Sequence, residues 1–258
     1  MIETYRRQLA PFLFPVEETT VYSDIPGVDE MPVASREHKA ITRSDTGALI
    51  AIQRNSYKLV SNQSIIEPLL EEIEKLNVAY YIDPSHSFVS DQRMRLQLTF
   101  PEYTIHDGRS DIALSLYLHN SYDSSNGVQL LMGAIRGICK NGMVFGTVLS
   151  KFYGRHTLNF DLSSVQRMLT NTGEKLPVIK HRIEALQNSK VDKSVRGDVQ
   201  RILGQKITKY IEQEEEARQR RAENLWALYN LCTWYISHKI QMKMRADYQI
   251  RTSKIFGL

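Results

Sequence analysis

One segment of the sequence interleaves basic and aromatic side chains in a pattern that suits binding of unpaired nucleic acid. Residues 151–157 read Lys-Phe-Tyr-Gly-Arg-His-Thr. Lysine and arginine neutralise phosphates, and a flat ring stacks on an unpaired base whatever the base is. The same pattern would also suit a segment that buries an aromatic ring in the core. We predict phosphate contacts for Lys151, Arg155 and His156, and a stacking role for Tyr153.

A second candidate segment places cations beside a glycine-containing turn. Residues 136–143 read Arg-Gly-Ile-Cys-Lys-Asn-Gly-Met. A turn of this kind can expose backbone N–H groups, which together with flanking cations hold a phosphate. We therefore add Arg136 and Lys140 to the predicted nucleic-acid-binding residues, while a surface turn with solvated charges remains the alternative. No arrangement that would activate the Cys139 thiol is visible, so we predict no catalytic residue.

Acidic and histidine side chains between residues 91 and 123 are the third candidate, because such groups could build a metal-dependent nuclease. They lack the close ligand spacing of a motif such as HExxH, and solvated turn residues are the simpler interpretation. Within residues 120–127, a single carboxylate is too few for a calcium or magnesium site, so this segment predicts a tight turn. We predict no metal and no cofactor. The set comprises Asp91, Glu102, His106, Asp107, Asp111 and Asp123.

Residues 226–238 are dense in aromatic side chains within an amphipathic helical pattern. Aromatic residues at this density usually lie in a core or at a subunit interface. The polar residues Asn230, Thr233 and His238 interrupt the pattern. We expect the segment to serve packing or assembly.

The composition describes an ordinary globular chain with a mildly basic surface. The chain has 258 residues, of which 42% are hydrophobic, and a formal net charge of +4. Basic residues concentrate in 180–209 and 239–254, which is compatible with a nucleic-acid partner. Two cysteines without a CxxC pair predict neither a disulfide framework nor a zinc site. No leader peptide and no membrane span is expected, so we predict a cytoplasmic protein.

Strand patterns dominate the first part of the chain. Residues 93–100 and 111–119 alternate cleanly between apolar and polar side chains, which predicts an antiparallel meander with one buried face and one polar face. Shorter strands are expected at 48–53, 57–60 and 78–82, and a helix at 64–76. The pattern at 129–139 suits either a strand or a helix.

Helical patterns dominate the C-terminal part, at 165–169, at 178–186 and along 206–247 as one helix or two. The prediction is an α+β fold in which a twisted antiparallel sheet packs with helices and a helical C-terminal part follows. We place an irregular N-terminal arm at 1–40, with one or two short strands, the sheet core with its helix at 41–165, and the helical region at 166–258. These parts are expected to form one cooperative domain.

Several short segments together resemble one protein family, and the resemblance runs from about residue 40 to about residue 240. They are 45–47 (Asp-Thr-Gly), 57–62, 120–125, 136–143, 155–157 (Arg-His-Thr) and 226–230, followed by Thr233 and His238. This set resembles the phage and plasmid proteins grouped as domain of unknown function 932. One departure is Tyr122, which stands in 122–125 where the family resemblance suggests a histidine. The resemblance implies a setting in mobile elements and DNA handling, and it brings no established activity or cofactor.

The function that we predict is sequence-independent binding of nucleic acid, above all of single-stranded DNA, in phage or plasmid recombination. The predicted order of elements is loosely similar to that of phage single-strand annealing proteins, so we expect a homo-oligomer that promotes annealing, with RNA as the other nucleic-acid partner. Two alternatives remain open. One is a protein–protein module such as an inhibitor of host defence, and the other is the metal-dependent nuclease.

Overall fold

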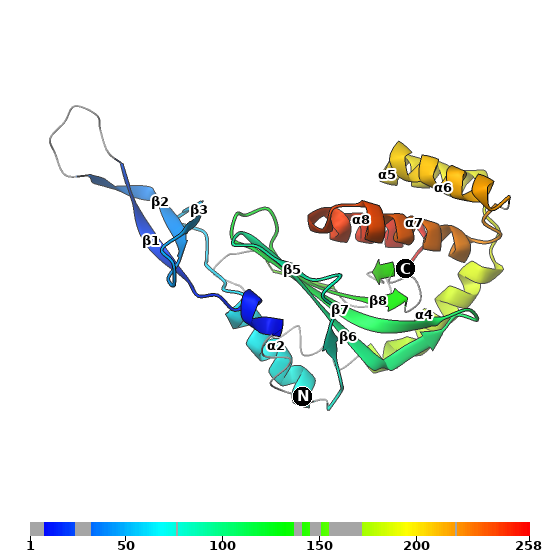
Figure 1. The fold of residues 1–258 in the computed structure, drawn as a ribbon, viewed down its shortest axis with the longest axis horizontal. Helices are drawn as coiled ribbons and strands as arrows, with labels where there is room; N and C mark the ends of the chain where they lie inside the picture. The colour runs from blue at the N-terminus through cyan, green and yellow to red at the C-terminus, as the bar shows by residue number, and fades with distance from the viewer. Residues whose placement is uncertain are drawn as a thin grey trace.

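The computed structural model describes residues 8–23, 32–75, 77–136, 141–144, 151–154, 172–219 and 221–258. Within these residues the chain forms two antiparallel sheets, and its helices gather in the C-terminal part (Figure 1). The predicted α+β class is therefore confirmed. The predicted boundary at residue 165 falls outside the described residues.

Alternation of apolar and polar side chains produces the larger sheet, which has seven strands. Its centre consists of β6 (Arg93–His106), β7 (Asp111–Ser121) and β8 (Val128–Arg136), paired in that order. The two predicted alternating strands are confirmed, and the segment that the pattern left undecided is strand β8. The short strands are β4 (Tyr81–Ile82), β5 (Phe88–Val89), β9 (Asn141–Val144) and β10 (Lys151–Gly154).

The apolar face of this sheet belongs to the main core together with α2 (Gln63–Lys75), the helix expected at 64–76. Burial of one α2 stripe, including Ile65, Leu69 and Ile73, follows from the helical spacing of these residues. The N-terminal end of α2 is fixed to β7, because the Asn120 side chain donates a hydrogen bond of 2.9 Å to the Asn62 side chain. Figure 1 shows α2 on the side of the sheet opposite α7 and α8.

The polar face of the same sheet is also buried, which the strand pattern did not predict. Arg95, Gln97 and Tyr117 all have an exposed fraction of 0%. Helix α8 (Met242–Ile255) covers them, with Gln249 hydrogen-bonded to Arg95 and Ile250 packed against Tyr117. Alternation of apolar and polar residues indicates the polarity of a strand's two faces. It does not indicate whether a later segment of the chain covers the polar face.

His119, on this covered face, makes folding stability depend on pH. Burial, together with the charge of Arg95, lowers the pKa of His119 from 6.5 to about 3. The unfolded chain therefore binds the proton more tightly, so stability is present above pH 6.5 and is lost as the pH falls toward 3. We expect this residue to reduce the free energy of unfolding by about 2 kcal/mol between pH 7 and pH 5.

Urea unfolding of wild type and His119→Gln at both pH values checks this expectation, since the variant should lose most of that pH dependence. His38→Gln provides the control, because it makes the same substitution at an exposed position rather than at the buried one of His119. Equal pH dependence in wild type and His119→Gln would contradict the assignment.

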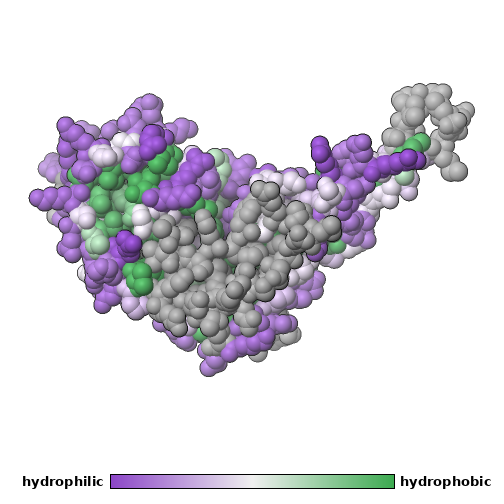
Figure 2. Space-filling view, turned by 180° about the vertical axis from the view of Figure 1, so that it is seen from behind, coloured by the Kyte–Doolittle hydropathy of each residue, from purple (hydrophilic) through white to green (hydrophobic). Residues whose placement is uncertain are grey.

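The N-terminal part contains longer strands than the sequence pattern indicated. Strands β1 (Val16–Ser23), β2 (Val33–Arg43) and β3 (Leu49–Arg54) form a three-stranded sheet that projects from the body (Figure 1). Figure 2 shows the described surface of this projection as largely hydrophilic. The strand expected at 57–60 is wrong, because these residues run as a loop between β3 and α2.

Tyr122, the departure from the family pattern, connects the projecting sheet to the larger one. Its ring is buried at 1% exposure and lies edge-on to Phe14, with ring centroids 6.1 Å apart. Its hydroxyl accepts a hydrogen bond of 2.9 Å from the Asn62 N–H. The residue therefore has a packing role at the junction of the two sheets.

The helical region consists of five described helices of nine residues or more: α4 (Thr172–Asn188), α5 (Lys193–Leu203), α6 (Gln205–Ala217), α7 (Leu225–Lys239) and α8. Helix α4 confirms the helix expected at 178–186, and residues 165–169 lie outside the described part. The stretch 206–247 belongs to three helices rather than one or two. Asn224 starts a new helix by accepting a hydrogen bond from the Ala227 N–H, and Ile240 is extended between α7 and α8.

Candidate nucleic-acid interface

The predicted binding residues lie along one edge of the larger sheet, as far as the structure describes them. Lys151 and Tyr153 belong to β10, where their backbones pair with Leu131 and Gln129 of β8. Arg136 ends β8 and pairs with Asn141 of β9. At about 3.4 Å per residue, the part of β8 between Leu131 and Arg136 spans roughly 17 Å, so Arg136 is not adjacent to β10.

The sheet register thus brings Lys151 and Tyr153 onto one strand and sets Arg136 apart from them. The side chains of these three residues, and the whole of Lys140, Arg155 and His156, lie outside the described residues. Their phosphate contacts and the stacking role of Tyr153 remain predictions.

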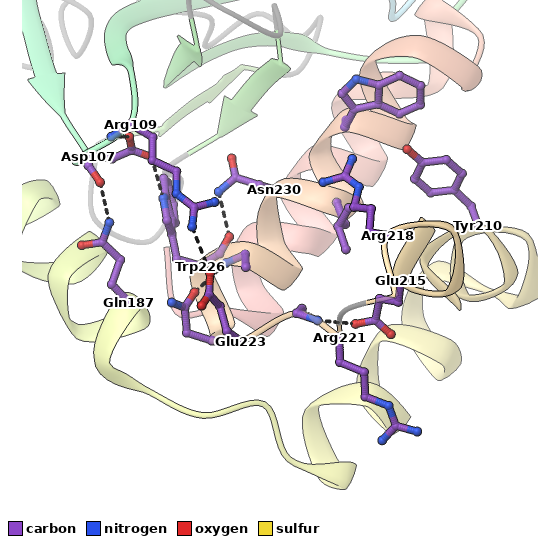
Figure 3. A pocket seen from close by; sticks show the side chains of 15 residues that line it. Asp107, Arg109, Gln187, Tyr210, Glu215, Arg218, Arg221, Glu223, Trp226 and Asn230 are labelled. Carbon is purple, nitrogen blue, oxygen red and sulfur yellow. Dashed lines mark hydrogen bonds and ion pairs between the residues drawn. The ribbon is translucent and has the colours of Figure 1, made fainter. Parts of the chain in front are cut away.

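A pocket of about 530 Å³ lies elsewhere, between the β6–β7 turn and helices α4, α6 and α7 (Figure 3). Its lining joins cations to aromatic rings, the two kinds of group that a single-strand binder needs. The lining residues that carry this chemistry are Arg109, Arg218, Arg221, Tyr210, Trp226 and Trp234.

Asp107 holds one wall of the pocket together. This buried carboxylate accepts hydrogen bonds from the backbone N–H groups of Arg109 and Ser110, at 3.0 and 2.9 Å, and so closes the β6–β7 turn. Its second oxygen accepts a 2.8 Å bond from the Trp226 indole N–H. Gln187 of α4 donates a 2.6 Å bond to the Asp107 carbonyl, so one turn residue ties the sheet to two helices (Figure 3).

Glu215 holds the opposite wall. Arg196 of α5 donates two hydrogen bonds to this carboxylate, at 3.0 and 2.7 Å, and the Ala222 N–H donates a third at 2.7 Å. Although burial alone raises the pKa of Glu215, the bonds from Arg196 and Ala222 hold it below its usual value. Glu215 therefore stays charged at neutral pH and fixes the connection between α6 and α7.

The arginines of the pocket are exposed and weakly held. Arg109 pairs with Glu223 at 2.9 Å, and its side chain is 72% exposed. Arg218 pairs with Glu214 at 2.9 Å and is 65% exposed. Arg221 forms no ion pair within the described part of the chain, and Figure 3 shows it extending away from the other labelled side chains. Because exposed ion pairs contribute only about 0–1 kcal/mol each, an incoming phosphate can displace these carboxylates at small cost.

A column of stacked rings runs from the pocket to the surface. The rings of Tyr210 and Trp234 are nearly parallel, with centroids 5.3 Å apart. Trp234 stacks in turn with the exposed ring of His238 at 4.5 Å, and the Lys239 ammonium lies 5.8 Å from the Trp234 centroid. Burial, together with the negative charge of Glu214, raises the pKa of Tyr210 to about 12, so this ring stays neutral.

The sequence interpretation of 226–238 as packing or interface was incomplete. Trp226 and Tyr229 are buried and belong to the core, but Trp234 is only half-buried and His238 is exposed. The available signal was spacing: Asn230, Trp234 and His238 recur every four residues and form a stripe apart from the apolar one.

The acidic and histidine set is dispersed over the molecule. Asp91 pairs with Arg43, Asp123 with Arg93, and His106 with Asp111. The segment 120–127 forms the turn between β7 and β8, in which the Ser121 hydroxyl bonds to the backbone of Asn126. Within the described ranges, no group of three or more histidine, cysteine, aspartate or glutamate side chains could hold a metal ion.

Cys232, the described cysteine, has a structural role. Cys232 is buried in α7, where burial raises the pKa of its thiol to about 12. The thiolate that attacks substrates is therefore not populated at neutral pH. None of the helices in the described segments combines the length and the apolar character that crossing a bilayer requires.

Comparison with known proteins gives a family and no activity. Neither curated proteins nor solved structures provide a significant match to the chain. The family model described as "Domain of unknown function (DUF932)" matches residues 50–254, from β3 to α8. Since this match covers most of the 258 residues, the chain belongs to the DUF932 family.

Proposed function

We propose that this protein binds single-stranded DNA without sequence specificity. The observation that carries the proposal is the ring column Tyr210–Trp234–His238, which rises from a pocket lined by exposed arginines. Every base has a π-face, so stacking on such a column tolerates any sequence. The exposed ring of His238 is the end of the column on which a base can stack.

The surrounding charges suit the backbone of the same strand. Lys206 and Lys209 lie on α6, the helix that carries Tyr210 and that Arg218 follows directly, and both lysines are exposed. Lys239 follows His238 directly. Of the basic stretches seen in the sequence, the part on α4, α6 and α7 borders the pocket, and the rest lies mainly on α5 and α8. The cations on α6 and α7 support a path for phosphates along these two helices.

A mechanism for annealing follows from this arrangement. Side chains that hold phosphates and stack face-to-face on a base leave the Watson–Crick edges of the bases free to pair. We propose that the protein promotes annealing of complementary strands as a homo-oligomer, in the recombination of mobile DNA. RNA, which offers the same phosphates and bases, is the second substrate to test.

The decisive measurement is fluorescence anisotropy of labelled single-stranded DNA, duplex DNA and RNA of equal length. We expect the single strand to bind most tightly, with affinity that falls steeply as salt is raised, because phosphate neutralisation releases counterions. Trp234→Ala should weaken binding roughly 5- to 150-fold, the equivalent of the 1–3 kcal/mol that stacking of one base contributes.

Two further variants make this measurement specific. His238→Ala removes the exposed end of the column with little loss of packing and should also weaken binding. Tyr22→Ala removes an exposed ring on the projecting sheet, 62% exposed, and should leave binding unchanged. Wild-type affinity in a folded Trp234→Ala protein would remove the column from the proposed interface, and no binding of any nucleic acid at low salt would overturn the proposal.

A further inference from the structure

The covered polar face of the larger sheet contains a guanidinium that has no carboxylate partner among the described residues. Arg95 is fully buried, at 0% exposure. Its Nη2 donates a hydrogen bond of 3.0 Å to the Gln249 side-chain oxygen. Its Nε and Nη1 have no hydrogen-bond partner in the part of the chain that the structure describes. By contrast, the half-buried Arg196 has a carboxylate partner, since it donates two hydrogen bonds to Glu215.

The side chains around Arg95 add a second positive charge and another buried nitrogen. The guanidinium carbon lies 4.8 Å from the centroid of the Tyr117 ring. His119, which is opposite Arg95 in the β6–β7 register, has a buried Nε2 that makes no hydrogen bond to any described residue. Arg245 lies one helical turn before Gln249 on α8 and is close enough to Arg95 to repel its charge.

Neither Arg95 nor Arg245 forms an ion pair with a carboxylate of the described segments. Asp83 attracts Arg95 from a distance, but its carboxylate is engaged by Ser85 at 2.5 Å and His86 at 3.2 Å. Burial, followed by smaller effects that include the charge of Arg245, lowers the pKa of Arg95 to about 10, so the group remains a cation at neutral pH. A buried cation is costly unless a counter-charge accompanies it. The sheet and α8 therefore enclose positive charge, on Arg95 and Arg245, that no described carboxylate neutralises.

We propose that the centre formed by Arg95 and Arg245 binds a phosphate group. Two guanidinium cations match the double charge of a phosphate better than the single charge of a carboxylate, and arginine is the side chain best suited to phosphate oxygens. The Nε and Nη1 of Arg95 supply donors inside, and the half-buried Arg245, whose Nε donates a 2.9 Å hydrogen bond to the Ile240 carbonyl, supplies a second cation. This site lies on the sheet under α8, and none of its residues lines the ring-column pocket.

Thermal unfolding tests the site with inorganic phosphate as the probe, titrated against chloride at equal ionic strength. At a phosphate concentration a hundred times the dissociation constant, the wild-type Tm should rise by about 5–10 °C. Arg95→Met should lose this response, while its Tm without phosphate equals or exceeds that of wild type, because an unpaired buried cation is replaced by an apolar chain.

Two more variants keep the test decisive. Arg93→Met, on the same strand, removes an arginine that already pairs with Asp123 at 2.7 Å, so its phosphate response should remain. Should Arg95→Met fail to fold, Arg245→Gln replaces it and should reduce the response. A Tm rise of equal size in wild type, Arg95→Met and Arg245→Gln would reflect the general stabilising effect of phosphate on proteins, and it would overturn the proposal. The absence of any Tm rise in wild type would overturn it as well.

The source of the phosphate is tested with two oligonucleotides of the same sequence, one 5′-phosphorylated and one with a 5′-hydroxyl. A larger Tm rise with the phosphorylated strand, lost in Arg95→Met, assigns the site to a nucleic-acid end. A response to inorganic phosphate alone assigns it to a small phosphate compound. The result with inorganic phosphate is independent of Trp234, so it stands whether or not the ring column binds DNA.

Discussion

Gly133→Ala is expected to destabilise the protein by about 3 kcal/mol. Gly133 lies in β8 where the strand meets both β9 and the Tyr117 ring. A Cβ at this position would overlap the Met143 carbonyl oxygen and would lie 2.7 Å from a Tyr117 ring carbon. The carbonyl belongs to the backbone of the neighbouring strand, so the clash can be relieved only by moving β9, together with the ring that shields the buried face.

Gly197→Ala is the matched control for this effect. Gly197 lies in α5, and a Cβ built there meets nothing within 4 Å. Alanine in a helix should stabilise the protein by about 0.5–1 kcal/mol relative to glycine. Urea unfolding of both variants measures the difference. Similar stability changes in the two proteins would show that β8 and β9 do not approach each other as closely as the structure states.

Asp107→Ala is expected to cost about 3 kcal/mol, because one buried carboxylate serves three hydrogen bonds. The variant removes the acceptors for two turn N–H groups and for the Trp226 indole. These bonds join the β6–β7 turn to α7, so their loss should also loosen the pocket wall. We expect a lower urea midpoint and a change in Trp226 fluorescence in the folded state.

The same hairpin supplies the control for Asp107. Asp111→Ala removes a carboxylate whose side chain is 74% exposed and which pairs only with His106 across the strand ends. A change within about 0.5 kcal/mol is expected, as for other exposed ion pairs. A large loss in Asp111→Ala, or no loss in Asp107→Ala, would contradict the assignment of the anchor to residue 107.

The pattern of the sequence was sufficient for elements whose side chains alternate or recur strictly. Strands β6 and β7 and helix α2 were predicted from their apolar positions, because burial on one face imposes that period on the sequence. The strand at 57–60 was predicted wrongly. Tyr57 and Val60 are buried, but they belong to a loop that leads from β3 to α2.

The sequence was also insufficient for the candidate site. Residues 107, 196, 215 and 234 are far apart in the chain, and their contacts depend on how α4–α7 pack against the β6–β7 turn. Local spacing carries no information on such contacts. The basic stretches were visible in the sequence, but the aromatic residues of 226–238 were assigned to packing or assembly. A helix rich in aromatic residues has the same sequence pattern whether each ring faces the core or a pocket.

By itself, the sequence determined the α+β class, the family, the alternating strands and the absence of a CxxC pair, since each of these depends on residue types at short separations. The tertiary structure decided which faces are covered. It buried the polar side of the sheet under α8, left Arg95 without a counter-charge, and aligned Tyr210, Trp234 and His238 in one column. The physical reason is that burial and charge balance depend on what lies across each side chain in space, which only the packing of distant segments determines.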